Sequence, residues 1–251
     1  MTYTGKIVRM NKIFKEDGKS FVIAMDHGIG GTTKGIEDFE EVVKKVTEGG
    51  ADAVLVNFGQ ARRIAPYTSR RIGMLLTIPN DAKYVPMAVK LGADAVKTTY
   101  FGSVPLSENL IDKFMEVAMV CEDWGMPFMA EIVPQDSNGK LIYEVEKIKQ
   151  AARIGVELGG DIIKTSYAGS PMEYKEVVRS CKAPIVVLGG EKMDSQVDLL
   201  KVVKNAMDAG AAGGTIGRNI WQQKDPKKIT RAIISIVHEG ATVEQAAKLL
   251  N

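Results

Sequence analysis

Eight short apolar runs, separated by longer and more polar segments, extend along almost the whole sequence. Each run is five to seven residues long and most are rich in β-branched residues. They lack the polar alternation of a half-exposed strand and are typical of parallel strands covered on both faces. We predict eight strands, at Phe21–Met25, Ala53–Asn57, Gly73–Ile78, Ala93–Thr99, Phe128–Val133, Asp161–Ser166, Pro184–Leu188 and Gly213–Gly217.

Most connections between these runs have the apolar spacing of amphipathic helices. The segment Asn80–Leu91 predicts a short helix, whereas Gln60–Arg71 has the weakest pattern and is expected to be mostly loop. Strands that alternate with helices predict right-handed crossovers and a parallel sheet. The clearest predicted helices are Ile36–Glu48, Leu106–Asp123, Tyr143–Leu158, Met172–Ser180, Gln196–Ala209, Pro226–His238 and Val243–Leu250.

A glycine motif recurs at four predicted helix-to-strand junctions. The sequence GADAV occurs at Gly50–Val54 and again at Gly92–Val96, and variants begin at Gly159 and Gly210. Each glycine stands where the C-cap of a helix favours a left-handed residue. Eight strand–helix units within 251 residues favour a closed barrel over an open sheet. We therefore expect an α/β fold, a single-domain (β/α)8 TIM barrel over residues 1–251, with a short segment 1–19 before the first strand.

The charge and composition narrow the possible partners. The chain has 33 Lys and Arg against 31 Asp and Glu, a net charge of +2, without a block of like charge. This balance argues against nucleic-acid or membrane-surface partners and leaves small anionic substrates possible.

The cysteines, histidines and apolar stretches predict the compartment and the absence of a metal. Cys121 and Cys181 form no CxxC pair, which predicts buried thiols in a reducing compartment. No stretch approaches the roughly 20 apolar residues of a membrane span, so we expect a cytoplasmic protein. The two histidines offer no ligand cluster, and we expect neither a metal nor another cofactor.

The active site of a parallel barrel forms at the carboxyl ends of its strands, which makes Lys164 the strongest candidate. Lys164 lies two residues before the end of the sixth predicted strand, although lysine is seldom buried. If the side chain points inward, burial and nearby positive charge favour the neutral amine. A neutral amine attacks a ketone, and the resulting iminium accepts electrons when a carbon–carbon bond breaks. The alternative is a lysine at a strand edge with its ammonium in solvent.

Two further strand ends carry ionisable side chains. Lys97 stands in a run, VKTTY, that is similar to IKTSY around Lys164. It can be the nucleophile, a charged neighbour of the nucleophile, or an exposed strand-end charge, and we favour the neighbour role. Asp26 ends the first strand, where a carboxylate can move protons to and from substrate hydroxyls or order the glycine-rich loop that follows. His27 is adjacent and is expected to support that loop.

Glycines follow the seventh and eighth strands and predict a phosphate site. Gly189 and Gly190 follow strand seven, and Gly217 with Arg218 follows strand eight. Glycines let backbone N–H groups approach an anion, and arginine adds a bidentate contact. Glycine pairs can also be plain turn residues. We add Lys97 and Ser166 to the expected substrate-binding residues.

Three motifs together resemble a known family. They are Ala24–Gly28 (AMDHG), Asp161–Gly169 (DIIKTSYAG) and Gly214–Ile220 (GTIGRNI), and they are similar to the archaeal-type class I fructose-bisphosphate aldolases. Relatives of that family include aminodideoxyheptulosonate synthases and a bacterial thiolase of quorum-signal breakdown. The similarity extends from about Gly5 to His238.

The resemblance implies roles for particular residues. Lys164 is implied as the Schiff-base residue and Asp26 as an acid/base group. The phosphate ligands that it implies are Gly189, Gly190, Gly217 and Arg218. It also implies a homo-oligomer.

One position departs from that family. Its members usually have a tyrosine before the proline of the fifth-strand motif, where this chain has Val133. Glu131 lies two residues earlier and therefore on the same face of the strand. We expect Glu131 or Asp26 to supply the missing proton transfer, with Tyr100 and Tyr167 as alternatives.

These observations predict a Schiff-base aldolase of a phosphorylated ketose, with fructose 1,6-bisphosphate as the first substrate to test. The main alternative is a transaldolase-like synthase that transfers a three-carbon unit to another aldehyde. A sugar-phosphate isomerase or a thiolase on the same barrel, and a non-catalytic sugar-phosphate sensor, are the other possibilities.

Overall fold

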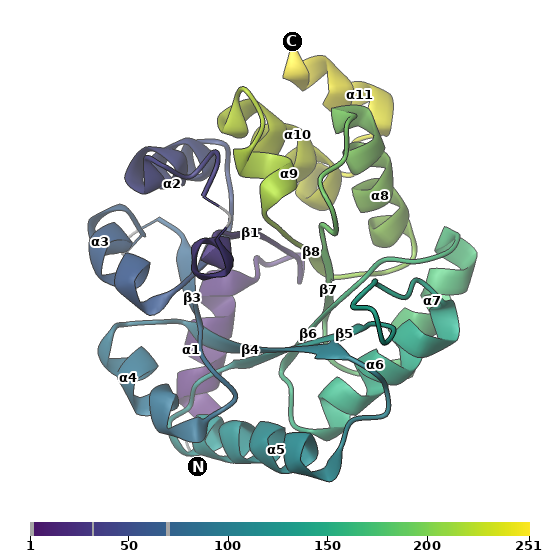
Figure 1. The fold of residues 1–251 in the computed structure, drawn as a ribbon. Coiled ribbons are helices and arrows are strands. Elements are labelled where there is room, and N and C mark those ends of the chain that lie inside the picture. The colour runs from purple at the N-terminus through teal and green to yellow at the C-terminus, as the bar shows by residue number, and fades with distance from the viewer. Residues whose placement is uncertain (1–2, 32, 69–70) are drawn as a thin grey trace.

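The computed structural model describes residues 3–31, 33–68 and 71–251 and contains a closed barrel of parallel strands. The strands pair in chain order, and β1 closes the ring by pairing with β8 (Figure 1). This confirms the predicted (β/α)8 barrel. The strands are β1 Ser20–Ala24, β2 Ala53–Val56, β3 Gly73–Thr77, β4 Ala95–Gly102, β5 Phe128–Pro134, β6 Ile162–Thr165, β7 Ile185–Leu188 and β8 Gly213–Ile216.

Helices form the outer layer around this ring (Figure 1). Those at the predicted positions are α2 Phe39–Glu48, α4 Val85–Lys90, α5 Glu108–Asp123, α6 Val145–Glu157, α7 Pro171–Ser180, α8 Gln196–Asp208, α10 Pro226–Glu239 and α11 Val243–Ala247. Short 3-10 turns are η1 Asp26–Gly30, η2 Ala82–Tyr84 and η3 Lys248–Leu250. No helix within the described residues is both long enough and apolar enough to cross a membrane.

Three helices were not expected from the sequence. The second connection is helix α3, Phe58–Thr68, so the prediction of a loop there was wrong. It buries Ala61 and Ile64 on one face, and this packing outweighs the weak pattern and an internal proline. A short helix α9, Arg218–Trp221, follows β8. Helix α1, Tyr3–Ile13, precedes β1 and lies behind the ring in Figure 1.

The interior of the barrel is apolar at one end, which α1 closes. A buried cluster joins Ile13 of α1 to inward-facing strand residues such as Ala95, Met129 and Ile162. Side chains two residues apart point to the same side of a strand. The residues two positions further along these strands therefore also point into the barrel, nearer its carboxyl end. They are Lys97, Glu131 and Lys164.

The recurring glycine motif connects neighbouring strands at the amino-terminal end of the barrel. Its glycines adopt the predicted left-handed conformation, with φ of 95° at Gly50 and 76° at Gly92. The aspartate of the motif accepts a backbone hydrogen bond from a neighbouring strand. Asp52 binds the Phe21 N–H at 2.6 Å, and Asp94 binds the Met74 N–H at 3.0 Å. The repeat therefore links adjacent strands at this end.

Both cysteines are buried free thiols, as predicted. Burial raises the pKa of Cys121 to about 12, so its thiol stays protonated.

His238 connects this end of the barrel to α10. Its Nδ1 lies 2.8 Å from Asp17 and its Nε2 lies 2.8 Å from Asp52. The hydrogen bond to Asp52 has the largest effect on the pKa of His238 and raises it above the ordinary value of 6.5, although burial acts in the opposite direction. Protonated His238 therefore stabilises the folded protein. This contribution is fully present when the pH is below the pKa that the histidine has in the unfolded chain, and it is lost as the pH rises through its pKa in the folded protein.

We predict that His238→Gln lowers the free energy of unfolding most at pH 6 and progressively less toward pH 9. The expected difference at pH 6 is on the order of 1.5–3 kcal/mol, the range for hydrogen bonds to charged groups. Urea unfolding of both proteins across this pH range measures it. A difference that does not change with pH would contradict the ion-pair assignment.

Candidate active site

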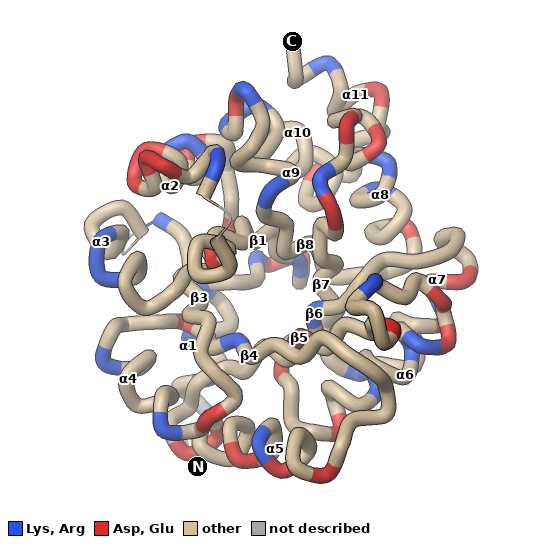
Figure 2. Tube along the Cα trace, in the orientation of Figure 1, with Lys and Arg blue, Asp and Glu red and all other residues tan. Residues whose placement is uncertain are grey.

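Four ionisable side chains meet inside the barrel at the carboxyl ends of its strands. Lys97 comes from β4, Glu131 from β5 and Lys164 from β6, and Asp26 follows β1 at the start of η1. Figure 2 shows acidic and basic residues at these strand ends, within the ring of helices. The side chains of Lys97, Glu131 and Lys164 are 3%, 5% and 6% exposed, so their charges must be satisfied by one another.

Glu131 bridges the two lysines. Its Oε1 lies 2.6 Å from Nζ of Lys164, and its Oε2 lies 2.8 Å from Nζ of Lys97. The second oxygen also accepts a hydrogen bond of 2.8 Å from the Thr99 hydroxyl. A carboxylate held in this way can exchange a proton with the amine of Lys164 without moving.

Lys97 is held as a cation. Its Nζ contacts Asp26 at 2.9 Å, Glu131 at 2.8 Å and the Thr99 hydroxyl at 2.6 Å. Burial alone would lower the pKa of Lys97, but the charges of Glu131 and Asp26 outweigh it and raise that pKa. Of the roles left open for Lys97, this geometry agrees with the charged neighbour and does not favour the nucleophile.

The same charges keep both carboxylates ionised. Burial opposes ionisation of Glu131, yet the charges of Lys164 and Lys97 lower its pKa to about 2. Burial likewise opposes ionisation of Asp26, and Lys97, Lys164 and the Thr77 hydroxyl together lower its pKa. The site thus contains two carboxylates and at least one fixed ammonium at neutral pH.

Asp26 has both features expected from its position. Its carboxylate reaches the centre of the barrel, where Oδ2 accepts a 2.7 Å hydrogen bond from Thr77. Its backbone carbonyl accepts a bond of 2.7 Å from Asn57, which orders the turn that follows β1. His27 packs edge-to-face on Trp221, with ring centroids 5.6 Å apart, which agrees with the expected support of the loop.

The loops after β7 and β8 meet beside Lys164. Arg218 begins α9 and donates a hydrogen bond of 3.2 Å to the Gly190 carbonyl. A Cβ on Gly189 would lie 2.6 Å from Ile216, and one on Gly217 would lie 2.6 Å from the Ala24 carbonyl. Close packing against β8 therefore requires Gly189, and close packing against β1 requires Gly217, whatever else they bind.

Two polar groups near these loops have no partner within the described part of the chain. They are the Ser166 hydroxyl and Nε of Arg218, both buried as atoms. Buried polar groups are normally paired, so each is available to a ligand.

A cavity of about 690 Å³ connects most of these groups. Among the predicted site residues, Asp26, Lys97, Glu131, Lys164 and Arg218 line it. Gly189, Gly190, Gly217 and Ser166 do not belong to its lining. The structure thus brings the four ionisable side chains and the arginine into one space, with the remaining phosphate candidates beside it.

Sequence reasoning missed four polar residues that organise the site. Thr77 and Thr99 hold the carboxylates, and Asn57 holds the turn after β1. Asn219 joins the phosphate loops, since its amide donates to the carbonyls of Gly189 and Glu191, each at 2.9 Å. The spacing of two residues along β3 and β4 could have found both threonines.

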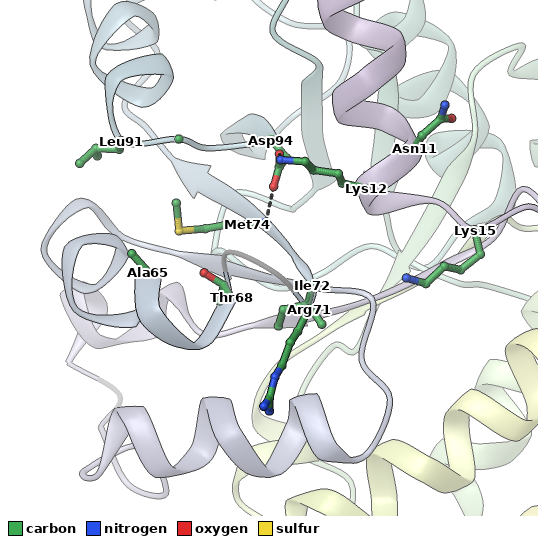
Figure 3. A pocket seen from close by; sticks show the side chains of 11 residues that line it. Asn11, Lys12, Lys15, Ala65, Thr68, Arg71, Ile72, Met74, Leu91 and Asp94 are labelled. Atoms are coloured by element: carbon green, nitrogen blue, oxygen red, sulfur yellow. Dashed lines mark hydrogen bonds and ion pairs between the residues drawn. The ribbon is translucent and has the colours of Figure 1, made fainter.

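A second cavity lies at the opposite end of the barrel (Figure 3). Its volume is about 380 Å³, and its lining includes Lys12, Lys15 and Asp94. Lys12 pairs with Asp94 at 3.0 Å, and Lys15 lies 3.5 Å from Asp52. These carboxylates also bind the strand backbone, so the basic residues here serve stability.

Among the residues that the structure describes, no three His, Cys, Asp or Glu side chains form a group that could hold a metal ion.

Comparison with known proteins identifies the class of protein. The architecture is similar to that of class I aldolases, which form a Schiff base. Residues 20–223 match the DeoC/LacD family of aldolases, and the chain belongs to this family.

Two relatives are similar over nearly their whole length. The chain is 37% identical over 254 residues to a 2-amino-3,7-dideoxy-D-threo-hept-6-ulosonate synthase of Archaeoglobus fulgidus, covering 96% of this chain and 94% of the relative. It is 31% identical over 270 residues to an uncharacterised aldolase of Saccharolobus solfataricus, covering 98% and 99%.

Two solved structures share the fold and part of the sequence. An archaeal fructose 1,6-bisphosphate aldolase is 28% identical with a TM-score of 0.82, covering 94% of this chain and 100% of that one. A Schiff-base-forming fructose-1,6-bisphosphate aldolase, analysed with its reaction intermediates, is 28% identical with a TM-score of 0.80, covering 93% and 100%.

We predict that Lys97→Met destabilises the protein at pH 7, because it leaves Asp26 and Glu131 buried with too little positive charge. Breaking a buried pair in this way costs about 3–5 kcal/mol. The loss should shrink as the pH falls, since the unpaired carboxylates then become neutral by protonation. Urea unfolding at pH 7 and pH 5 measures both effects.

Lys227→Met is the control, since Lys227 pairs with Glu48 at 2.9 Å on the surface. We expect no measurable change from it. Equal stabilities of the two variants would show that the interior charges are not coupled.

Proposed function

We propose that this protein is a class I aldolase that makes or breaks a carbon–carbon bond in a phosphorylated ketose through an iminium on Lys164. The observation that carries the proposal is the buried amine of Lys164, 2.6 Å from a carboxylate and in the same cavity as Arg218. An amine nucleophile is activated by an adjacent general base, and the Glu131 carboxylate is in direct contact with the buried amine of Lys164.

Glu131 is the group positioned to move protons during Schiff-base formation. It takes a proton from the Lys164 ammonium, and the free amine then attacks the substrate carbonyl. The proton returns to the hydroxyl of the carbinolamine, which leaves as water and forms the iminium. The contact of 2.6 Å allows both transfers without rearrangement.

Cleavage then needs a base beyond the scissile bond. Asp26 or Glu131 removes the proton of the substrate hydroxyl, the carbon–carbon bond breaks, and its electron pair passes into the iminium to form an enamine. Protonation of the enamine carbon and hydrolysis release the three-carbon half. Lys97 acts as the fixed positive charge that holds both carboxylates in place.

The phosphate of the three-carbon half would bind beside Lys164, at the loops after β7 and β8. Arg218 supplies positive charge within the cavity, and Ser166, Gly189, Gly190 and Gly217 are the further candidate ligands in the adjoining loops. The unpartnered Ser166 hydroxyl and Arg218 Nε support this placement.

Two reactions fit this arrangement. The first is reversible cleavage of a ketose phosphate such as fructose 1,6-bisphosphate, as the names of two solved relatives suggest. The second is a transaldolase-like synthesis that transfers a three-carbon unit, which the name of the Archaeoglobus relative favours. Val133 is compatible with either, because Glu131 supplies proton transfer in both. The homo-oligomer and the cytoplasmic location remain predictions.

We predict that borohydride reduction with dihydroxyacetone phosphate leaves a covalent adduct on Lys164, because reduction traps the iminium. Peptide mass spectrometry locates it, and Lys164→Met should abolish it. The folding of that variant is checked by circular dichroism. An adduct on Lys97 would overturn the assignment, and no adduct on the wild type would reject the aldolase in favour of an isomerase or a sensor.

We predict that Glu131→Gln lowers kcat by about 10²–10⁴-fold, the usual contribution of a positioned acid or base. Turnover of fructose 1,6-bisphosphate, or of another ketose phosphate that the wild type cleaves, measures it. Glu116→Gln is the control, since Glu116 is exposed on α5, and it should keep full turnover. Full turnover in Glu131→Gln would remove Glu131 from the mechanism and leave Asp26 as the base.

A further inference from the structure

A further pocket, separate from the cavity at the amino-terminal end of the barrel, opens beside the catalytic cavity. Its volume is about 520 Å³, within the roughly 300–1,000 Å³ of small-molecule sites. The two spaces share a wall, so a bound molecule can extend from one into the other. The residues that line both are Ile29, Asn57, Thr77, Ile78 and Pro79.

This pocket lies across the barrel from the proposed phosphate loops. It is built on the carboxyl ends of β2 and β3 and on residues Lys83–Met87 of η2 and α4. In the closed ring, β3 is four strands from β7 and therefore opposite it (Figure 1). A substrate with its phosphate at β7 and β8 and its carbonyl at Lys164 directs its other end toward this pocket.

Most of the residues that line the pocket are apolar. Several of these apolar side chains are exposed to solvent, whereas such positions are usually polar. The exposed fractions are 83% for Ile29, 47% for Phe58 and 43% for Met87. Apolar surface gathered in a concave site indicates that a ligand covers it. The apolar lining residues are Ile29, Phe58, Leu76, Ile78, Pro79, Tyr84 and Met87.

Among the described residues at this end of the substrate path, little positive charge is free to bind a second phosphate. Lys83 is the cation among the described lining residues of the pocket, and it pairs with Asp81 while its Nζ lies 5.1 Å from the centre of the Tyr84 ring. In the adjoining cavity, Lys97 and Lys164 are paired with carboxylates. A phosphate placed here would have to break one of these pairs.

We propose that the substrate half beyond the scissile bond carries no phosphate and ends in an apolar group, which this pocket binds. The natural acceptor in the synthetic direction is then an aldehyde with an alkyl or aromatic tail. This inference rests on the proposed aldolase function. The enamine carbon of the three-carbon donor bonds to the aldehyde carbon, the aldehyde oxygen takes up a proton, and hydrolysis of the iminium releases a ketose monophosphate.

The test supplies dihydroxyacetone phosphate and compares straight-chain aldehydes from ethanal to pentanal with glyceraldehyde 3-phosphate. Burial of each methylene should raise kcat/KM about fourfold, or about 60-fold across the series. The kcat/KM for pentanal should exceed the kcat/KM for glyceraldehyde 3-phosphate. Borohydride trapping on Lys164 is measured in parallel, because it needs the donor alone.

A charge introduced into the pocket tests the location. Met87→Arg should lower the ratio of kcat/KM for pentanal over glyceraldehyde 3-phosphate at least tenfold, since it places an unpaired cation where the tail binds. Met115→Arg is the matched control, because Met115 is 45% exposed on α5 and Met87 is 43% exposed. It should leave the ratio unchanged.

The outcomes separate the two proposals. The apolar pocket is overturned if an adduct forms on Lys164 but kcat/KM does not rise along the aldehyde series. It is also overturned if the adduct forms and glyceraldehyde 3-phosphate is the preferred acceptor. In both cases the aldolase proposal is retained. An unchanged ratio in Met87→Arg also overturns the location. Absence of the adduct rejects the aldolase and, with it, the inference drawn here.

Discussion

The ion pairs between Lys97, Lys164 and the two buried carboxylates are the constraint on which the rest of the site depends. Glu131 contacts both lysines, and Asp26 contacts Lys97, so each charge is balanced inside the barrel. Removing charges from water is costly unless they are paired and hydrogen-bonded. Thr77 at the end of β3 and Thr99 within β4 donate further hydrogen bonds to these carboxylates. This balance keeps the Lys164 amine and the Glu131 carboxylate in contact within a folded protein.

The two ends of the barrel use the same residue types for different purposes. At the amino-terminal end, Asp52 and Asp94 accept backbone hydrogen bonds and pair with lysines of α1 and the segment that follows it. At the carboxyl end, Asp26 and Glu131 contact buried lysines that line a cavity. This difference arises because all strands of the barrel run in the same direction. The loops that follow the strands, which vary and bind ligands, therefore all lie at the carboxyl end.

The sequence predicted most of the fold, and it singled out Lys164, which the structure places in the cavity. The eight apolar runs placed every strand, with β4 extending three residues further than expected, to Gly102. Helix α3 was missed because its stability comes from packing rather than from its own pattern. Lys164 was found because a lysine within an apolar strand has few explanations. The role of Lys97 stayed open because a strand pattern does not say which charges lie across the barrel.

The sequence by itself determined the periodicities, the turn glycines and the positions of charges along each strand, because these depend on neighbours within a few residues. Only the tertiary structure decided which charges meet, because Asp26, Lys97, Glu131 and Lys164 are separated by 33 residues or more and are brought together by closure of the ring. The same holds for the apolar pocket beside them. Its walls come from three separate loops, and its shape exists only once β2 and β3 are paired.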